Sequence, residues 1–256
     1  MIKNAYITGA SSGIGEEFAN QLAASYNLIL VARNKSKLES LVKELNLKHS
    51  ETKASSLPLD LTESKDISSF CKTIENDSNL GMLVNNAGYG TVGEFAELDI
   101  QEELREIQLN VTTLVAATHS ALKNFKKQNT GIIINVASIA SYLPAPYSAT
   151  YAATKAYVRS FTESIHEEAK VHGILVQALC PGLTHSDFHQ RAGIEKKDFP
   201  NFMWMNSKEV VSTSIKSLKS KQAVCIPGAV NQSAVGLTNF IPSSLTRKFA
   251  GMLMKK

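Results

Sequence analysis

The sequence has few cysteines and no long hydrophobic segment. Its three cysteines, Cys71, Cys180 and Cys225, form neither a C-x-x-C pair nor a metal-ligand spacing, and their odd number suits a reducing compartment. No apolar run approaches the roughly 18 residues of a membrane-spanning helix. An apolar strand candidate begins within a few residues of Met1, so no signal peptide is expected. These absences predict a cytoplasmic protein without a metal site.

Net charge is also low, and most of the chain is balanced. The sequence has 27 basic and 23 acidic residues, and residues 237–256 contain four basic residues and no acidic one, which equals the whole net charge of +4. The rest of the chain has equal numbers of acidic and basic residues and no basic face, which argues against nucleic-acid binding. We therefore expect one domain over residues 1–236, followed by a basic amphipathic C-terminal tail over residues 237–256.

The tail combines its basic residues with an apolar stripe. These residues follow Pro242 and comprise Leu245, Phe249, Met252 and Leu253, together with Arg247, Lys248, Lys255 and Lys256. Three roles are open for this segment: docking on its own domain or on a second subunit, peripheral membrane attachment, or disorder.

Strand and helix patterns alternate along the chain, whose apolar fraction of 43% can build a sizeable core. Seven short apolar segments have strand character, near residues 5–8, 28–32, 54–59, 82–85, 131–137, 174–180 and 222–226. Longer helical patterns separate them. Residues 98–125 are a long amphipathic example, with a stripe of Leu104, Ile107, Val111, Leu114, Val115 and Leu122. The alternation predicts an α/β fold, a doubly wound parallel sheet with helices on both faces.

A glycine-rich turn follows the first strand candidate. Residues 4–15 read Asn-Ala-Tyr-Ile-Thr-Gly-Ala-Ser-Ser-Gly-Ile-Gly, and a helical pattern comes next. In this context the free N–H groups of a helix N-terminus bind phosphate. Gly9 permits a sharp exit from the strand, Gly13 lets the backbone approach a pyrophosphate, and Gly15 lets the helix pack closely on the sheet. The turn therefore supplies the candidate dinucleotide-binding residues Gly9, Ser11, Ser12, Gly13, Ile14 and Gly15.

The same turn also fits the nucleophile elbow of α/β-hydrolases. Gly9-Ala-Ser11-Ser-Gly13 matches G-x-S-x-G, and Asp187 and His189 follow in the order of a catalytic triad. An elbow this early in the chain has no preceding strand and loop to supply the second oxyanion N–H. We therefore favour the dinucleotide site.

A tyrosine and a lysine share one face of a predicted helix. Tyr151 and Lys155 are four residues apart in a segment with the pattern of a helix start. A free phenol has a pKa near 10, about three units too high for proton exchange at neutral pH. A cation about 4 Å away is worth roughly 4 kcal/mol at an effective dielectric constant near 20, which is about those three units. The pair can therefore turn Tyr151 into an acid–base group.

Five separated motifs resemble those of the short-chain dehydrogenase/reductase family, in its compact single-domain branch. They occur in the family's order and spacing over roughly residues 3–225: Thr8-Gly-x-x-x-Gly-Ile-Gly15, Asn85-Asn-Ala-Gly88, Asn110, Ser138 with Tyr151-x-x-x-Lys155, and Pro181-Gly182. The resemblance implies a Rossmann-like fold and a nicotinamide cofactor. The stripe in residues 98–125 can simply pack on the sheet, but in that family the matching region often builds a dimer interface, so the resemblance also implies a homo-oligomer.

The resemblance assigns a role to each candidate catalytic residue. Tyr151 donates its proton to a substrate carbonyl oxygen, or removes a hydroxyl proton in the oxidative direction. Lys155 lowers the Tyr151 pKa and holds the nicotinamide ribose hydroxyls. Ser138, at the end of a strand candidate, hydrogen-bonds the substrate oxygen and polarises it. Asn110 bends the long helix around a water that joins Lys155 to solvent.

The end of the second strand candidate indicates which cofactor is bound. An NAD site needs a carboxylate about 20 residues beyond the glycines, to accept from the ribose 2′-hydroxyl, and none occurs between Glu17 and Glu39. Arg33 instead offers a fork for a 2′-phosphate, with Lys35 and Lys37 nearby. Many NADP-dependent relatives carry a basic residue just before the second glycine, where this chain has a serine. We predict NADP(H).

Further cofactor contacts are expected after later strands. By resemblance, Asp60 contacts the adenine amino group, and Thr184 resembles the hydroxyl that contacts the nicotinamide amide. The remaining expected contacts are Asn86, Ala87 and Gly88 beside the adenosine half, the strand-ending pair Pro181 and Gly182, and Tyr151 with Lys155.

Residues 185–206 lack a clean period and are predicted to form a substrate lid. His185 and His189 lie there, but without a third ligand they do not predict a metal site. The expected pocket wall is apolar and partly aromatic, formed by Tyr89, Leu143, Pro144, Tyr147, Leu183, Phe188 and Trp204. Such a wall favours a hydrophobic ketone, aldehyde or secondary alcohol as substrate.

The sequence thus predicts an NADP(H)-dependent oxidoreductase that acts on an apolar carbonyl or alcohol. The alternative is a non-catalytic NADP-binding regulatory protein on the same fold. Such proteins usually lose the tyrosine or the lysine, and both are present here.

Overall fold

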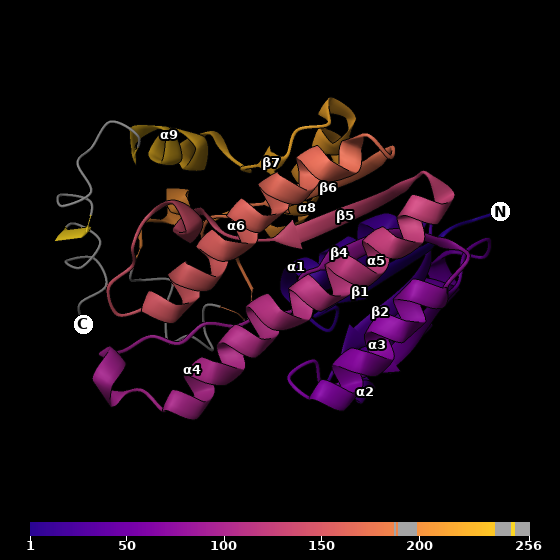
Figure 1. Cartoon of the computed structure of the whole chain (residues 1–256), viewed down its shortest axis with the longest axis horizontal. Helices are drawn as coiled ribbons and strands as arrows, with labels where there is room; N and C mark the ends of the chain where they lie inside the picture. The colour runs from indigo at the N-terminus through magenta and orange to yellow at the C-terminus, as the bar shows by residue number, and fades with distance from the viewer. Residues whose placement is uncertain (187, 189–198, 239–246, 249–256) are drawn as a thin grey trace.

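Seven apolar segments pair as parallel strands in one sheet of the computed structural model, which describes residues 1–186, 188, 199–238 and 247–248 (Figure 1). The strands are β1 (Asn4–Thr8), β2 (Asn27–Ala32), β3 (Ala54–Pro58), β4 (Leu80–Asn85), β5 (Gly131–Val136), β6 (Ile174–Leu179) and β7 (Val224–Cys225). Their order is β3-β2-β1-β4-β5-β6-β7, and every neighbouring pair is parallel. The predicted doubly wound fold and all seven predicted strand segments are confirmed. The strand order reverses between β1 and β4, which is where ligands bind in such sheets.

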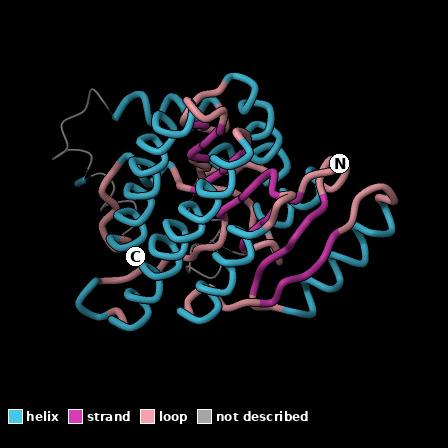
Figure 2. The backbone as a smooth tube through the Cα atoms, turned by 45° about the vertical axis from the view of Figure 1, so that its right-hand side comes forward, coloured by secondary structure: helices cyan, strands magenta, loops and turns pink. Residues whose placement is uncertain are grey.

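Helices connect the strands and cover both faces of the sheet (Figure 2). The α-helices are α1 (Gly13–Leu22), α2 (Lys35–Lys48), α3 (Ser64–Asn76), α4 (Ile100–Ile107), α5 (Leu114–Gln128), α6 (Ala149–Lys170), α8 (Ser207–Ser217) and α9 (Ala229–Thr238). Short 3₁₀ turns lie at η1 (Phe95–Glu97), η3 (Ile139–Tyr142), η5 (Asn201–Met203) and η6 (Leu218–Ser220). No helix in these described ranges has the length and apolar content needed to cross a bilayer.

Side chains of alternate strand residues form two cores, one on each face of the sheet. On one face Ile7 and Leu30 pack with residues of α1, α2 and α8. On the other face Tyr6 and Val31 pack with residues of α3, α5 and α6. Successive strand residues point to opposite faces, so a strand that is apolar on both faces needs cover on both sides.

The predicted amphipathic segment 98–125 is helical, and its apolar stripe is buried at Leu114 in α5 but exposed in α4. A π-helical turn, η2 (Gln108–Thr113), separates α4 from α5. Leu104 and Ile107 are 52% and 41% exposed, whereas Glu103 and Glu106 are 3% and 0% exposed. A π turn adds one residue to the helical path and so rotates the preceding turn by roughly 100° relative to the helix that follows. The apolar stripe therefore does not continue on one face of the helix from α5 into α4.

Candidate active site

The predicted site residues meet at one edge of the sheet because each follows the carboxyl end of a parallel strand. In sheet order they are Asp60 after β3, Arg33 after β2, Gly9 after β1, Asn86 after β4, Ser138 after β5 and Pro181 after β6. The carboxyl ends of parallel strands lie at the same edge, which is the ligand-binding edge of a doubly wound sheet.

At its glycine positions the turn between β1 and α1 leaves no space for a side chain. Gly9 and Gly13 have φ values of +66° and +61°, a region that favours glycine. A Cβ at Gly9 would lie 2.8 Å from the Asn86 side-chain nitrogen, and a Cβ at Gly15 would lie 2.3 Å from the Gly9 carbonyl oxygen. Ile14 packs against the adjoining core. The turn therefore places backbone N–H groups at an open edge, and it fits a dinucleotide phosphate.

Thr8 and Asn86 join the ends of β1 and β4 beside this turn. The Thr8 hydroxyl accepts hydrogen bonds of 2.9 Å from the backbone N–H groups of Asn86 and Ala87. The Asn86 side-chain amide donates to the Thr8 carbonyl at 2.9 Å. These bonds fix the two strand ends at the point where the strand order reverses.

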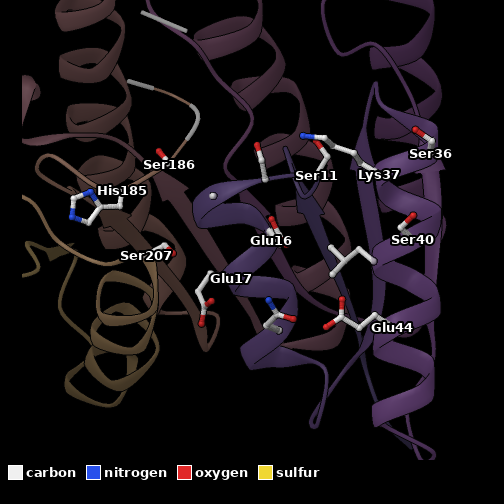
Figure 3. Close-up of a pocket in the computed structure, with 14 residues that line it drawn as sticks. Ser11, Glu16, Glu17, Ser36, Lys37, Ser40, Glu44, His185, Ser186 and Ser207 are labelled. Atoms are coloured by element: carbon white, nitrogen blue, oxygen red, sulfur yellow. The ribbon is translucent and has the colours of Figure 1, made fainter. Parts of the chain in front are cut away.

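A polar hollow of about 660 Å³ lies beside the glycine turn (Figure 3). The turn, the exposed sides of α1 and α2, and the segment around residue 186 enclose it. Its lining comprises Ser11, Ser12, Gly13, Glu16, Glu17, Asn20, Ser36, Lys37, Ser40, Leu41, Glu44, His185, Ser186 and Ser207. The structure thus places the predicted residues Ser11, Ser12 and Gly13 together with Lys37 on one open surface.

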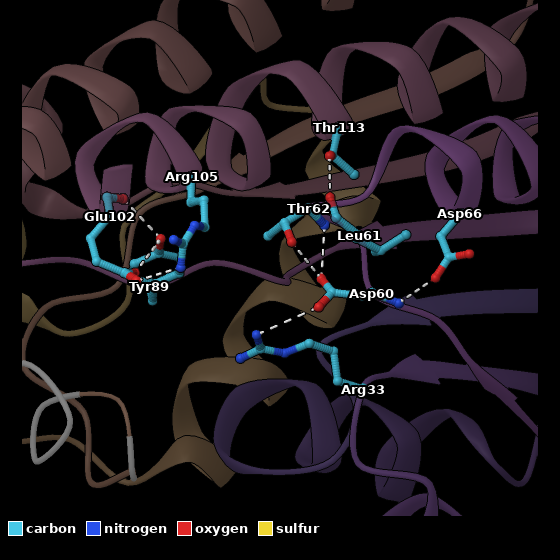
Figure 4. A network of polar contacts seen from close by, with 9 residues as sticks. All are labelled: Arg33, Asp60, Leu61, Thr62, Asp66, Tyr89, Glu102, Arg105 and Thr113. Carbon is cyan, nitrogen blue, oxygen red and sulfur yellow. Dashed lines mark hydrogen bonds and ion pairs between the residues drawn. The ribbon is translucent and has the colours of Figure 1, made fainter. Parts of the chain in front are cut away.

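Arg33 and Asp60 face each other beyond the ends of β2 and β3 (Figure 4). The closest nitrogen–oxygen distance is 3.7 Å, and the Arg33 side chain is 70% exposed. Partial burial disfavours the charge on Asp60, but hydrogen bonds from Thr62 and the charge of Arg33 outweigh it and hold the Asp60 pKa below its usual range. An exposed pair at this distance contributes at most about 1 kcal/mol. Arg33 is therefore free to rotate toward an anionic ligand.

Ser138 lies two residues beyond β5 and caps the η3 turn. Its hydroxyl accepts a hydrogen bond of 3.1 Å from the Ala140 backbone N–H and lies 3.5 Å from the Pro181 carbonyl oxygen. The hydroxyl also interacts with Tyr151, which lowers the pKa of that phenol. The predicted pair of Ser138 and Tyr151 is therefore brought together by β5 and the first turn of α6.

Tyr151 and Lys155 occupy adjacent turns of α6. The Lys155 ammonium nitrogen lies 5.7 Å from the centroid of the Tyr151 ring. It donates a 2.9 Å hydrogen bond to the Val136 carbonyl oxygen at the end of β5. Lys155 is buried, and this bond supplies one partner for its charge. The two side chains therefore meet at the sheet edge, as their four-residue spacing predicts.

The protonation of this pair differs from the expectation that Lys155 brings the Tyr151 pKa near neutrality. Burial raises the Tyr151 pKa to about 12, against the lowering effect of the Ser138 hydrogen bond. Burial also lowers the Lys155 pKa to about 8, although the nearby Glu106 favours its charged form. The Lys155 ammonium donates to the Val136 carbonyl oxygen and lies over the Tyr151 ring, and desolvation is the largest effect on the pKa of both groups. At neutral pH the phenol keeps its proton and Lys155 is largely charged.

Asn110 links the π turn to the catalytic end of α6. Its side-chain amide donates to the Tyr89 carbonyl at 2.8 Å and to the Thr154 hydroxyl at 3.1 Å. Its side-chain oxygen accepts from the Tyr89 backbone N–H at 3.2 Å. A Cβ at Gly88 would lie 2.8 Å from that oxygen and 3.4 Å from the Lys155 nitrogen. Gly88 therefore allows Asn110 and Lys155 to approach the same stretch of backbone.

The Gly90 backbone and the Phe188 side chain lie against the Tyr151 ring. A Cβ at Gly90 would lie 2.7 Å from the nearest ring carbon, so the backbone there packs directly on the ring. The Phe188 ring is 5.4 Å from it, centroid to centroid. Phe188, a predicted wall residue, thus presents an apolar ring to Tyr151.

A hydrogen bond and close packing hold the segment after β6 in place. Thr184 is buried, and its hydroxyl donates to the Gly182 carbonyl at 3.0 Å. A Cβ at Gly182 would lie 2.4 Å from the Asn231 side chain. His185 stacks on Trp204 with ring centroids 5.2 Å apart. Within the predicted lid, residues 187 and 189–198 lie outside the described residues, and they include Asp187 and His189 of the hydrolase and metal hypotheses.

Sequence reasoning gave no role to three residues that the structure places in the site. Thr8 joins β1 to β4, Thr154 accepts from Asn110, and Glu106 lies 3.4 Å from the Asn110 amide nitrogen. One signal for Glu106 was present in the sequence, since it precedes Asn110 by four residues and so shares its helix face. No comparable signal marks Thr154, which is one of many threonines on helices.

Comparison with known proteins identifies both sequence relatives and similar folds. A family model described as short chain dehydrogenase matches residues 3–197. A very-long-chain 3-oxoacyl-CoA reductase from Podospora anserina is 37% identical over 184 residues, covering 68% of this chain and 52% of the relative. A second one, from Phaeosphaeria nodorum, is 31% identical over 219 residues, covering 84% of this chain and 62% of the relative. The chain thus spans about half to two thirds of the length of these relatives.

Two solved structures resemble the chain over nearly its whole length. A short-chain dehydrogenase from Sphingobium yanoikuyae in complex with NADPH has a TM-score of 0.84 and 31% identity, with coverage of 94% of this chain and 97% of that one. A bulky-bulky ketone specific alcohol dehydrogenase from Comamonas testosteroni has a TM-score of 0.79 and 29% identity, with coverage of 94% and 96%.

Proposed function

This chain belongs to the short-chain dehydrogenase/reductase family, and we propose that it is an NADP(H)-dependent enzyme acting on a hydrophobic ketone, aldehyde or secondary alcohol. The observation that carries the proposal is the convergence of Ser138, Tyr151 and Lys155 at the same sheet edge as the glycine turn. A bound nicotinamide supplies or accepts the hydride. The protein must then bind the cofactor, orient the substrate and move one proton.

Tyr151 moves that proton. Because its pKa is raised to about 12, the phenol is protonated at neutral pH and can donate to a carbonyl oxygen that gains negative charge. The Ser138 hydroxyl, which favours the charged phenol, stabilises the phenolate that remains. Lys155 has a pKa near 8, so its charge is present at neutral pH to stabilise the same anion. In the oxidative direction the phenolate removes the substrate hydroxyl proton.

Arg33 and Lys37 support a preference for NADP(H). Arg33 follows β2, is largely exposed and is held by Asp60 only through a 3.7 Å contact. Lys37 lines the hollow beside the glycine turn. A guanidinium and an ammonium near that turn suit a 2′-phosphate, whereas a 2′-hydroxyl calls for a carboxylate acceptor. The similarity to a dehydrogenase solved with NADPH agrees with this choice.

The names of the relatives favour a bulky, apolar carbonyl substrate. Both reductase relatives are described as acting on very-long-chain 3-oxoacyl-CoA, and the second solved structure on bulky ketones. The Phe188 ring beside Tyr151 presents an apolar surface to such a substrate. We therefore propose a hydrophobic ketone, with long-chain 3-oxoacyl thioesters among the first candidates to be tested.

The proposal also covers the oligomeric state and the cellular location of the protein. The outward face of α4 carries Ile100, Leu104 and Ile107, all exposed. Such a contiguous apolar face fits burial against a second subunit, as in a homo-oligomer. We propose a catalytic domain over residues 1–236 in the cytoplasm. Only Leu237, Thr238, Arg247 and Lys248 of the basic tail are described, and its contact with the domain, a subunit or a membrane remains a proposal.

The test is a substrate screen combined with a matched pair of tyrosine variants. Apolar ketones, aldehydes and long-chain 3-oxoacyl substrates are offered with NADPH, and turnover is followed by nicotinamide absorbance. Tyr151→Phe should abolish turnover and leave NADPH binding, measured by fluorescence titration, nearly unchanged. Tyr157→Phe is the control, because Tyr157 lies in the same helix and is exposed. NADPH binding without turnover of any substrate would instead favour a non-catalytic regulator.

A further inference from the structure

The wall segment, residues 89–93, follows β4 and lies beside the Tyr151 ring. A Cβ at Gly90 would lie 2.7 Å from the nearest carbon of that ring, so the backbone of the segment packs directly on it. The position of the wall segment therefore limits the space in which Tyr151 can meet a substrate.

The wall segment is bonded on one side to α4 and to the π turn. The Asn110 side chain accepts from the Tyr89 backbone N–H at 3.2 Å and donates to the Tyr89 carbonyl oxygen at 2.8 Å. The Tyr89 hydroxyl donates to the Glu102 carbonyl oxygen at 3.0 Å (Figure 4). The Thr91 backbone N–H donates to a Glu106 oxygen at 3.1 Å. The first half of the wall segment is thus docked on this helix.

The wall segment is bonded on its other side to the chain just before α6. The Gly93 N–H donates to the Tyr147 carbonyl oxygen at 2.8 Å, and the Ser148 hydroxyl donates to the Thr91 carbonyl oxygen at 3.0 Å. Tyr147 has a φ of +65°, which a residue with a large side chain adopts only where neighbouring contacts hold it. The wall segment therefore connects α4 to the turn that precedes Tyr151 by four residues.

Two buried carboxyl groups of α4 complete this connection. Glu103 and Glu106 are 3% and 0% exposed. The Thr91 hydroxyl oxygen lies 2.5 Å from a Glu103 oxygen and 3.1 Å from a Glu106 oxygen. The second Glu103 oxygen accepts a hydrogen bond from the hydroxyl of Thr150, in the first turn of α6. One hydroxyl of the wall segment thus joins two carboxyl groups, and one of these also binds α6.

The shared hydroxyl cannot satisfy two ionised carboxylates. A hydroxyl has one proton to donate and can also accept. Both contacts are hydrogen bonds when Thr91 donates to an ionised Glu103 and a protonated Glu106 donates to Thr91. With both groups ionised, one contact has no proton and two like charges lie together in a buried site, which is unfavourable. The bonding of the wall segment is therefore complete only while Glu106 keeps its proton.

The titratable and charged groups around Glu106 belong to three parts of the chain. Glu103 lies on its own helix, Lys155 and Tyr151 on α6, and Tyr89 in the wall segment. Burial, the largest effect, raises the Glu106 pKa to about 7 against the hydrogen bonds from Thr91. The charge of Glu103 raises this pKa, and that of Lys155 lowers it. Glu106 therefore loses its proton near neutral pH.

We propose that Glu103 and Glu106 are positioning residues for Tyr151: they dock the wall segment against its ring while Glu106 is protonated, and ionisation of Glu106 weakens this docking. The proposal rests on the function proposed above, because it acts through the acid–base role of Tyr151. It involves no proton transfer between the glutamates and the catalytic residues. It makes the geometry of the site depend on pH separately from the titration of Tyr151 and Lys155.

The first test follows the wall segment by amide hydrogen exchange, without substrate. The Thr91 and Gly93 N–H groups report docking, since they donate to Glu106 and to Tyr147. A pKa raised from 4.5 to about 7 stabilises the docked state fully below pH 4.5, and this stabilisation is lost as the pH rises through 7. Release that returns Glu106 to a pKa of 4.5 therefore predicts protection factors, corrected for intrinsic rates, that fall about tenfold between pH 6 and pH 8.

A matched pair of variants assigns this change to one carboxyl group. Glu106→Gln should remove the pH dependence of protection, because an amide does not ionise. Glu97→Gln, the control, removes a carboxyl group from an exposed position in η1 and should keep the tenfold change. Equal protection at pH 6 and pH 8 in the wild-type protein overturns the proposal, and so does a tenfold change that persists in Glu106→Gln.

The second test asks whether docking positions Tyr151 during turnover. Thr91→Val keeps the shape of the side chain without its hydroxyl, whereas Thr91→Ser keeps the hydroxyl. Thr91→Val should lower kcat at pH 6 roughly tenfold, the effect of losing a hydrogen bond to a charged group, and should leave the NADPH dissociation constant within about twofold. Thr91→Ser should recover most of the lost kcat. Equal kcat values in the two variants overturn the positioning role.

The outcomes separate this proposal from the proposed function. Turnover by a wild-type protein whose wall segment has pH-independent protection overturns the docking by Glu106 and leaves the enzyme assignment intact. Absence of turnover, together with pH-dependent protection that Glu106→Gln removes, contradicts the proposed function and leaves the proton-dependent docking established.

Discussion

Replacement of Gly90 by alanine should disable the acid–base tyrosine without disturbing the cofactor site. The three atoms nearest to a Cβ at this position all belong to Tyr151, at 2.7, 2.9 and 3.2 Å. Carbon atoms in contact normally lie about 3.5–4.0 Å apart. The added methyl group must therefore displace the Tyr151 ring by roughly 1 Å. Gly90 does not have a positive φ, so the effect is steric rather than one of backbone strain.

A displacement of this size predicts a large loss of rate. Misplacing a reacting group by about 1 Å costs on the order of 100-fold in rate, which corresponds to roughly 2.7 kcal/mol of activation free energy. We expect kcat of Gly90→Ala to fall by about this factor in the nicotinamide absorbance assay. The dissociation constant for NADPH should stay within about twofold, because the methyl group is directed at the Tyr151 ring.

Gly236→Ala is the matched control. Apart from the backbone of its own helix, α9, the described residues place no heavy atom within 4 Å of a Cβ at Gly236. This variant should keep wild-type kcat and gain about 0.5–1 kcal/mol of stability, the usual advantage of alanine over glycine in a helix. Wild-type kcat in Gly90→Ala would refute the inferred contact between Gly90 and Tyr151. A loss of NADPH affinity equal to the loss of kcat would refute the separation of the two sites.

Two further predictions concern the cofactor and the pH dependence of stability. Arg33→Ala should weaken NADPH binding about 10–100-fold and leave NADH binding unchanged. Lys170→Ala, which removes an exposed ion pair with Glu167 in the last turn of α6, should change neither affinity, and equal losses for NADPH and NADH in Arg33→Ala would contradict the role of Arg33. The Glu106 pKa rises from 4.5 to about 7 on folding, so the folded state binds more protons between these values. The free energy of unfolding should therefore fall by roughly 3 kcal/mol from pH 4.5 to 7, relative to Glu106→Gln. A constant difference between the two proteins in urea denaturation at these pH values would be inconsistent with that shift.

The sheet could be predicted from the sequence because each strand is a short apolar run bounded by turn residues. Both faces of the sheet are covered, so strands such as β2 and β5 are apolar on both sides and stand out from the helices between them. The positions of Gly9, Arg33 and Ser138 then follow from topology, since a residue after a parallel strand must lie at the carboxyl edge. Sequence spacing can therefore place these candidate residues at one edge of the sheet.

Protonation could not be predicted in the same way. The four-residue spacing places Tyr151 and Lys155 on one face, but it does not say where the ammonium points. In the structure Lys155 donates to Val136, a residue nineteen positions away, and burial shifts the pKa of both groups. Desolvation and non-local hydrogen bonds decide these values, and neither is encoded in the local pattern.

Helix α4 departs from the usual helical pattern beside the candidate catalytic residues, and this coincidence has a physical basis. Local rules place leucine and isoleucine inside a helix and glutamate outside, and α4 does the reverse at Leu104, Ile107, Glu103 and Glu106. The π turn at Asn110 makes the reversal possible, because it shifts the register of α4 relative to α5. Departures from local rules are expected where function requires a buried polar group. An inward glutamate beside Asn110 and an outward apolar face are therefore two consequences of the same π turn.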